Sequence, residues 1–187
     1  MNIPQDSKIR IERSNIYETL VIPYGTGNVL KYLIGLFILF WLGGWFAGFK
    51  SAVDQVVNGK AESFLIFWLC GWTVGGLFAT YFLFRIFRPS VDESFVLLPS
   101  SIKYDSGIPP FQMHFGFTNQ KEAIKSMFPK RTRIEISREQ IKTISLRETD
   151  SGNRLTIDVG TKRIDIADGA SEIEREWLFK TLKERYS

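Results

Sequence analysis

Two long uncharged apolar runs lie close together in the first half of the chain. The first lies between Lys31 and Lys50 and contains 18 uncharged residues, and the second, residues 64–84, contains 21. A helix needs about 20 apolar residues to cross the hydrocarbon core of a bilayer. We therefore expect transmembrane helices at residues 29–49 and 64–87.

A short polar segment, residues 50–63, connects the two runs, with Asn58-Gly59 as its expected turn. So short an external loop requires an antiparallel helical hairpin. The basic residues set the orientation, because lysine and arginine accumulate on the cytoplasmic side of a membrane protein. The loop has Lys50 and Lys60, balanced by Asp54 and Glu62, whereas the other side has Arg10, Arg13, Lys31, Arg85, Arg88 and Lys103. We expect an integral membrane protein with both termini in the cytoplasm.

The two runs carry the same pattern of aromatic residues and glycines. Residues 40–48 recur as residues 67–75 after a shift of 27 positions, which superposes Phe, Trp, Leu, Gly, Trp and Gly. Small residues four positions apart let helix backbones approach closely within lipid, where packing rather than hydrophobicity drives association. The repeat therefore predicts helix-packing stripes, either within one hairpin or between subunits, at Gly44, Gly48, Gly71 and Gly75.

The first 28 residues are mostly polar, with a short strand-like patch at residues 17–23 that Pro23 ends. We interpret residues 1–28 as a cytoplasmic tail lying near the lipid headgroups. The alternative is that this segment adds a strand to the C-terminal domain.

The pattern changes after the linker at residues 88–92. Residues 93–187 show alternating apolar and polar positions, which is typical of strands. Strands are expected near residues 95–98, 102–104, 111–118, 134–137, 144–146, 155–159 and 164–166, with a short helix at 120–128. Ser171 and Glu174 form a capping box for a final amphipathic helix, on which Ile173, Trp177, Leu178 and Leu182 make an apolar stripe.

Several strands in meander order, followed by one helix with a central Trp177, resemble the pleckstrin-homology-like (PH-like) fold. The segments that carry the resemblance are Leu146-Arg147-Glu148, residues 153–158 and residues 174–178. They are similar to uncharacterised bacterial membrane proteins in which a transmembrane hairpin precedes such a domain. The resemblance covers residues 93–187 and implies a bent β-barrel or roll, closed by the helix, at the bacterial inner membrane. It carries over no functional residue.

Few residues are suited to catalysis. His114 is the single histidine and Cys70 the single cysteine, so there is no clustered metal-ligand motif and no disulfide. Acid–base chemistry requires histidine or paired carboxylates in a cleft, and no phosphate-binding or dinucleotide motif is present. We expect no enzyme, no cofactor and no metal. Most of the net charge of +4 flanks the apolar runs, which argues against nucleic acid as a partner.

The segment from Lys121 to Arg133 is the strongest candidate for an interaction. Its basic residues are Lys121, Lys125, Lys130, Arg131 and Arg133. Near an anionic membrane each could contribute about 1 kcal/mol of attraction. The alternative is a solvated basic face above a packed core.

These observations predict a non-catalytic, membrane-anchored adaptor that binds anionic membrane lipid or a protein partner at the cytoplasmic face. The competing hypothesis is an accessory subunit of a larger membrane complex, such as a transporter or channel. In that case the glycine stripes would contact a membrane-protein partner or a second copy of the chain.

Overall fold

The computed structural model describes residues 3–14, 16–25, 29–60, 62–111, 127–149 and 152–187. Two compact units share the chain. The hairpin unit comprises Thr26–Pro89 and Pro110–Met127, and the β unit comprises Met1–Gly25, Ser90–Pro109 and Phe128–Ser187. Each unit therefore contains segments that are separated in the sequence.

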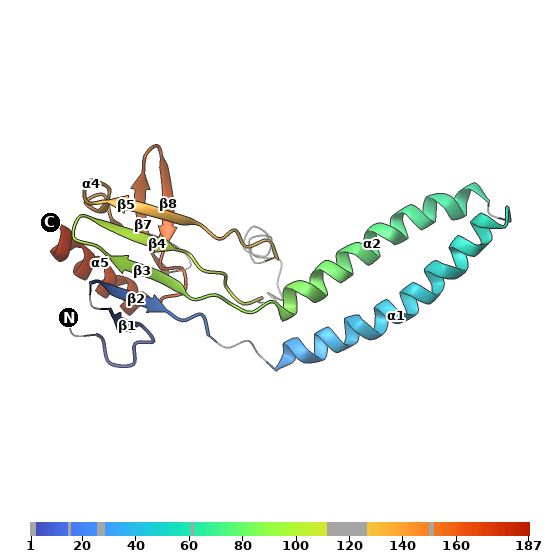
Figure 1. Ribbon diagram of the computed structural model, residues 1–187, viewed down its shortest axis with the longest axis horizontal. Helices are drawn as coiled ribbons and strands as arrows, with labels where there is room; N and C mark the ends of the chain where they lie inside the picture. Colours follow the sequence, from blue (N-terminus) through green and yellow to red (C-terminus); the bar gives the residue numbers. More distant parts are fainter. Residues whose placement is uncertain (1–2, 15, 26–28, 61, 112–126, 150–151) are drawn as a thin grey trace. The chain divides into compact units, whose positions relative to one another are not determined.

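The hairpin unit contains the two apolar helices, α1 (Leu30–Val57) and α2 (Ser63–Phe87), which lie side by side in Figure 1. Both are long and apolar enough to cross a membrane. Helix α1 continues to Val57, past the end expected at residue 49, because no proline or glycine interrupts residues 50–57. The expected turn at Asn58-Gly59 is confirmed, and Gly59 adopts a positive φ of 69°.

The N-terminal segment forms two strands of the β unit, so the predicted separate tail was wrong and the alternative, a strand added to the C-terminal domain, is confirmed. Strand β1 (Arg10–Arg13) pairs with β2 (Glu18–Ile22), and β2 pairs antiparallel with β3 (Glu93–Leu97). The alternation of Leu20 and Ile22, both fully buried, with half-buried Val21 matches a strand that has one face on a core. The helical hairpin is thus inserted between two neighbouring strands of one sheet.

Two antiparallel sheets make up most of the β unit (Figure 1). The first has the order β1-β2-β3-β4-β5, and the second has the order β6-β7-β8. The remaining strands are β4 (Ser101–Asp105), β5 (Arg133–Ser137), β6 (Ser145–Thr149), β7 (Gly152–Val159) and β8 (Lys162–Ile166). These positions confirm the expected strands around residues 95, 102, 134, 146, 155 and 164.

A short helix, α4 (Arg138–Ile141), connects the two sheets and was not expected from the sequence. Ser137 and Gln140 form a capping box that starts it, and Ile141 is buried. The strand expected at residues 111–118 and the helix expected at residues 120–128 lie almost wholly outside the described residues.

The C-terminal helix α5 (Glu172–Tyr186) closes the core that both sheets share. Its capping box is confirmed, since Ser171 and Glu174 bond to each other's backbone N–H groups. The predicted apolar stripe is partly wrong, because Leu178 and Leu182 are buried while Ile173 is 68% exposed. Ile173 lies in the first turn, where the neighbouring Glu174 takes the buried position instead.

Candidate functional site

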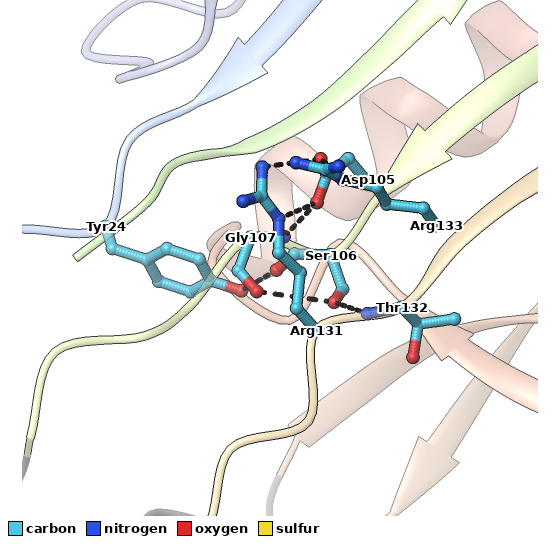
Figure 2. A network of polar contacts seen from close by, with 7 residues as sticks. All are labelled: Tyr24, Asp105, Ser106, Gly107, Arg131, Thr132 and Arg133. Atoms are coloured by element: carbon cyan, nitrogen blue, oxygen red, sulfur yellow. Dashed lines mark hydrogen bonds and ion pairs between the residues drawn. The ribbon is translucent and has the colours of Figure 1, made fainter.

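Four segments of the β unit meet where the chain runs to and from the hairpin unit. We call this place the junction and define it as Tyr24, residues 91–92, residues 105–108 and residues 131–133. Figure 2 shows much of its polar network, in which the labelled residues come from three of these segments. In the sequence each segment lies within a few residues of a boundary between the two units.

Asp105, the last residue of β4, is the centre of the junction. Arg131 Nε and Nη2 donate to the two carboxylate oxygens of Asp105 at 2.8 and 2.7 Å, and Arg133 Nε donates to Oδ2 at 2.8 Å. The hydrogen bonds that Arg131 donates lower the pKa of Asp105 to about 2, and hydrogen bonds from Gly107 N and Arg133 act in the same direction. The carboxylate is therefore ionised at neutral pH and fixes the direction of both guanidinium groups.

The register of the first sheet explains why these residues meet. Asp105 lies directly opposite Arg133 in the β4–β5 pair, and opposite charges in such pairs stabilise a sheet. Beyond that pair, Ser106 N donates to Thr132 O at 2.9 Å, and Thr132 N donates to Ser106 Oγ at 2.9 Å. The strand pairing is thus extended into the segment that contains the basic residues.

Gly107 allows a third segment to approach. It has a φ of +60°, and a Cβ atom there would lie 2.1 Å from Val91 O. Val91 and Ile108 form a two-bond bridge, with N–O distances of 2.9 and 2.8 Å. The chain that leaves α2 is therefore bound to the turn after β4, through a contact that only glycine permits.

Tyr24 links the segment that leads to α1 to the rest of the junction. Its hydroxyl donates to Ser106 O at 3.0 Å, and its backbone N donates to Asp92 Oδ1 at 3.2 Å (Figure 2 shows the first bond). The segments before and after the helical hairpin are thus tied to each other as well as to β4 and β5. Tyr24 follows Pro23 in a stretch without periodicity, so the sequence contained no signal of this role.

Three of the predicted interaction residues belong to the described part of the chain. Arg131 and Arg133 are brought together on Asp105, with 32% and 66% of their side chains exposed. Lys130 is exposed next to them. Asp105 contacts two of these three cationic side chains, so the three basic residues and this one carboxylate carry a net positive charge. Lys121 and Lys125 lie outside the described residues, as does His114.

The predicted glycine stripes do not meet within the hairpin. A Cβ atom added at Gly44, Gly71 or Gly75 would have no neighbour within 4 Å among the described residues, and at Gly48 the nearest atom is Trp72 Cζ2 at 3.8 Å. Packing between these glycines of different chains stays a prediction.

Two other glycines make the close contacts between α1 and α2. A Cβ atom at Gly76 would lie 2.2 Å from the Trp45 ring, and one at Gly35 would lie 2.4 Å from the Phe87 ring. Trp45 Nε1 also donates to Trp72 O at 3.1 Å. Trp45 of the repeat therefore packs between the two helices, and the glycine that it contacts, Gly76, lies one position after the repeat.

An open aromatic groove of about 500 Å³ lies on the hairpin and includes Gly71 and Gly75 in its lining. Its lining is almost wholly apolar and comes from both helices. The lining residues are Trp41, Trp45, Phe64, Phe67, Trp68, Cys70, Gly71, Trp72 and Gly75.

Within the described residues, no group of three or more His, Cys, Asp or Glu side chains is placed to hold a metal ion. Comparison of the chain with protein-family models, with curated proteins and with solved structures gave no match.

Proposed function

We propose that the protein is a non-catalytic, membrane-anchored adaptor, in which the β unit binds anionic lipid or a protein partner at the cytoplasmic face. The observation that carries the proposal is the exposed basic surface of Lys130, Arg131 and Arg133 at the junction. The two arginines are held in place by Asp105, so they lose little side-chain freedom on binding an anion.

A membrane location is supported by the surface of the hairpin. At 1.5 Å per residue, the 28 residues of α1 extend about 42 Å, which matches a bilayer including its headgroups. Large apolar side chains point outward along both helices, such as Phe40, which is 83% exposed, and Phe67, which is 79% exposed. An apolar surface of this extent requires lipid or a partner.

A common compartment for both ends of the hairpin is supported by the pairing of β2 with β3. One strand precedes α1 and the other follows α2, so a single sheet includes both flanks. The excess of basic residues on these flanks favours the cytoplasm, which in a bacterium implies the inner membrane.

A PH-like fold for the β unit is part of the proposal. It is supported by the meander order of β3 to β8, with α5 covering the shared core. In this proposal β1 and β2 come from before the hairpin, so the PH-like domain is formed by two separate parts of the chain.

Proximity of the basic segment to lipid is supported by a contact within the hairpin unit. Tyr81 Oη on α2 donates to Met127 O at 3.0 Å, and Lys130 follows Met127 by three residues. Three basic residues near an anionic surface would contribute about 3 kcal/mol. Because Asp105 offsets part of this charge, we expect about 1–2 kcal/mol.

The test uses the full chain in nanodiscs of phosphatidylcholine alone, or of one part phosphatidylglycerol to four parts phosphatidylcholine. Amide hydrogen exchange at residues 128–137 is expected to be slower with the anionic lipid, and added salt should weaken the effect. Changing Lys130, Arg131 and Arg133 to Gln together should remove the difference. A variant with Arg147, Lys162 and Arg163 changed to Gln, which loses the same charge on the second sheet, should retain it. An unmodified chain that exchanges equally in both lipids would refute lipid binding.

The competing function, an accessory subunit of a membrane complex, is favoured by Gly71 and Gly75, which line the aromatic groove and have open space around their Cα atoms, as Gly44 also does. In that case a membrane-protein partner should co-purify in mild detergent at constant stoichiometry. Changing Gly44 and Gly71 to Leu should abolish this co-purification, while the lysine and arginine changes should not affect it.

A further inference from the structure

The carboxyl group of Glu93 is fully buried in the β unit and accepts three hydrogen bonds. Tyr104 Oη donates to Oε1 at 2.6 Å, Ala167 N donates to Oε1 at 2.7 Å, and Gly169 N donates to Oε2 at 3.1 Å. The exposed fraction of Glu93 is 0%. Among the described residues, no lysine or arginine forms an ion pair with this carboxyl.

The Glu93 carboxyl connects the start of β3 with the corner before α5. Glu93 is the first residue of β3, six positions after the end of α2. Its backbone partners, Ala167 and Gly169, form the corner that precedes α5. Ala167 adopts a φ of +59°, which is unfavourable for a residue with a Cβ atom. The bond to Glu93 therefore helps to hold a strained corner.

The surroundings of Glu93 are acidic or neutral on most sides. Tyr104 comes from β4, Tyr24 follows β2, and Asp92 and Asp168 add negative charge nearby. From α5, Arg175 donates through Nε to Ala167 O and through Nη2 to Asp168 O. Burial raises the pKa of Glu93 to about 7, although the bonds from Tyr104 and Gly169 oppose this effect.

We propose that Glu93 is a proton-dependent tie between the strand that follows the membrane hairpin and the corner that starts the C-terminal helix. The ionised carboxylate has lone pairs for all three donors. A proton taken from solvent binds one oxygen and turns it into a donor. Oε2 has one partner whereas Oε1 has two, so the proton goes to Oε2 and the bond from Gly169 N is weakened first. Release of the proton to solvent restores the bond.

The proposal stands apart from the lipid-binding function, because it depends on no ligand. Its consequence is local: the corner at residues 167–169 is tied more firmly to β3 when the pH is above neutrality. The free energy of unfolding of the whole β unit changes in the opposite direction and decreases as the pH rises. Since burial raises the pKa of Glu93 from 4.5 in the unfolded chain to about 7, its stabilising contribution is complete below 4.5 and is lost as the pH rises through 7.

Nuclear magnetic resonance of the full chain in detergent micelles tests the tie. The amide signals of Ala167 and Gly169 should shift together with pH, with a midpoint at about 7, while the unfolding temperature should fall as the pH rises from 4.5 to about 7. Glu93→Gln should abolish the shift and flatten the temperature profile. Glu174→Gln, which changes another buried glutamate, should leave the midpoint unaltered.

Tyr104→Phe provides a second variant if Glu93→Gln fails to fold. It preserves the ring in the core but removes the hydroxyl that stabilises the ionised carboxylate, so the midpoint should move to higher pH. Wild-type amide signals without an inflection between pH 5 and 9 would overturn the proposal. An inflection that persists in Glu93→Gln would overturn it as well.

Discussion

At the scale of single residues, Gly107 has two separate reasons to be glycine. Its backbone has a positive φ, and its Cα lies against the backbone of Val91 and Asp92. Gly160, in the turn between β7 and β8, has a similar φ of +62° but open space around its Cα. Comparing the two positions separates conformational strain from the close approach of two chain segments.

We therefore predict that Gly160→Ala costs about 1–2 kcal/mol of unfolding free energy, the usual cost of the left-handed conformation. Gly107→Ala should cost about 3 kcal/mol or more, because the atom at 2.1 Å is a backbone oxygen that cannot rotate away. Denaturant unfolding of the full chain in detergent, followed through the amide resonances of β4 and β7, measures both. Equal losses would show that the contact with Val91 is unimportant.

Glu174 shows how a residue predicted for one task can have a second. The capping box with Ser171 was expected, but Glu174 Oε1 also accepts bonds from Ser7 Oγ at 2.9 Å and Lys8 N at 2.6 Å. Burial opposes ionisation here, yet the hydrogen bonds from Ser171, Ser7 and Lys8 lower the pKa of Glu174. The start of α5 is thereby joined to the N-terminal segment.

At the scale of elements, the closest contacts between α1 and α2 lie at Gly76 and Gly35 and not at the glycines of the repeat. Trp45 lies over Gly76, stacks at 6.5 Å on Trp72 and donates its indole N–H to Trp72 O. Small residues opposite large aromatic ones are an effective way to fill space between helices in lipid.

We predict that Gly76→Ala displaces the Trp45 indole and weakens the helix contact by about 1–3 kcal/mol, as overpacking does elsewhere. The indole N–H resonance of Trp45 should lose the shift due to its bond with Trp72, in micelles of the full chain. Gly75→Ala is the matched control, because a Cβ atom there has no neighbour within 4 Å. If both variants move the resonance equally, Gly76 has no special role in this packing.

At the scale of the whole molecule, the interrupted sheet determines which parts of the chain depend on one another. Strands β1 and β2 precede the hairpin, yet Leu20 and Ile22 are part of the same core as Leu178. We expect that residues 90–187 alone do not form the complete core, because two fully buried side chains would be missing.

The same arrangement predicts the membrane topology. In a Cys70→Ser background, single cysteines at Gln5 and Ser187 should react with a membrane-impermeant maleimide from the same side of the bilayer. A cysteine at Lys60, between α1 and α2, should react from the other side. Labelling of Gln5 and Ser187 from opposite sides would exclude a hairpin that crosses the membrane twice.

The sequence alone determined the features that depend on local pattern. Uninterrupted apolar runs predicted both long helices, period-two alternation predicted the strands near residues 95, 134 and 155, and Ser171 with Glu174 predicted the start of α5. These signals are readable because each depends on residues within one or two turns of one another.

Only the tertiary structure decided what those elements contact. Glu93 bonds to residues 74 and 76 positions away, and Glu174 bonds to residues 166 and 167 positions away. Such pairs produce no periodic pattern in the sequence, since a glutamate that is buried cannot be told from an exposed one by its neighbours in the chain. The N-terminal strands were misjudged for the same reason: a short polar segment becomes a strand when β3 supplies its hydrogen bonds and the shared core buries its apolar face.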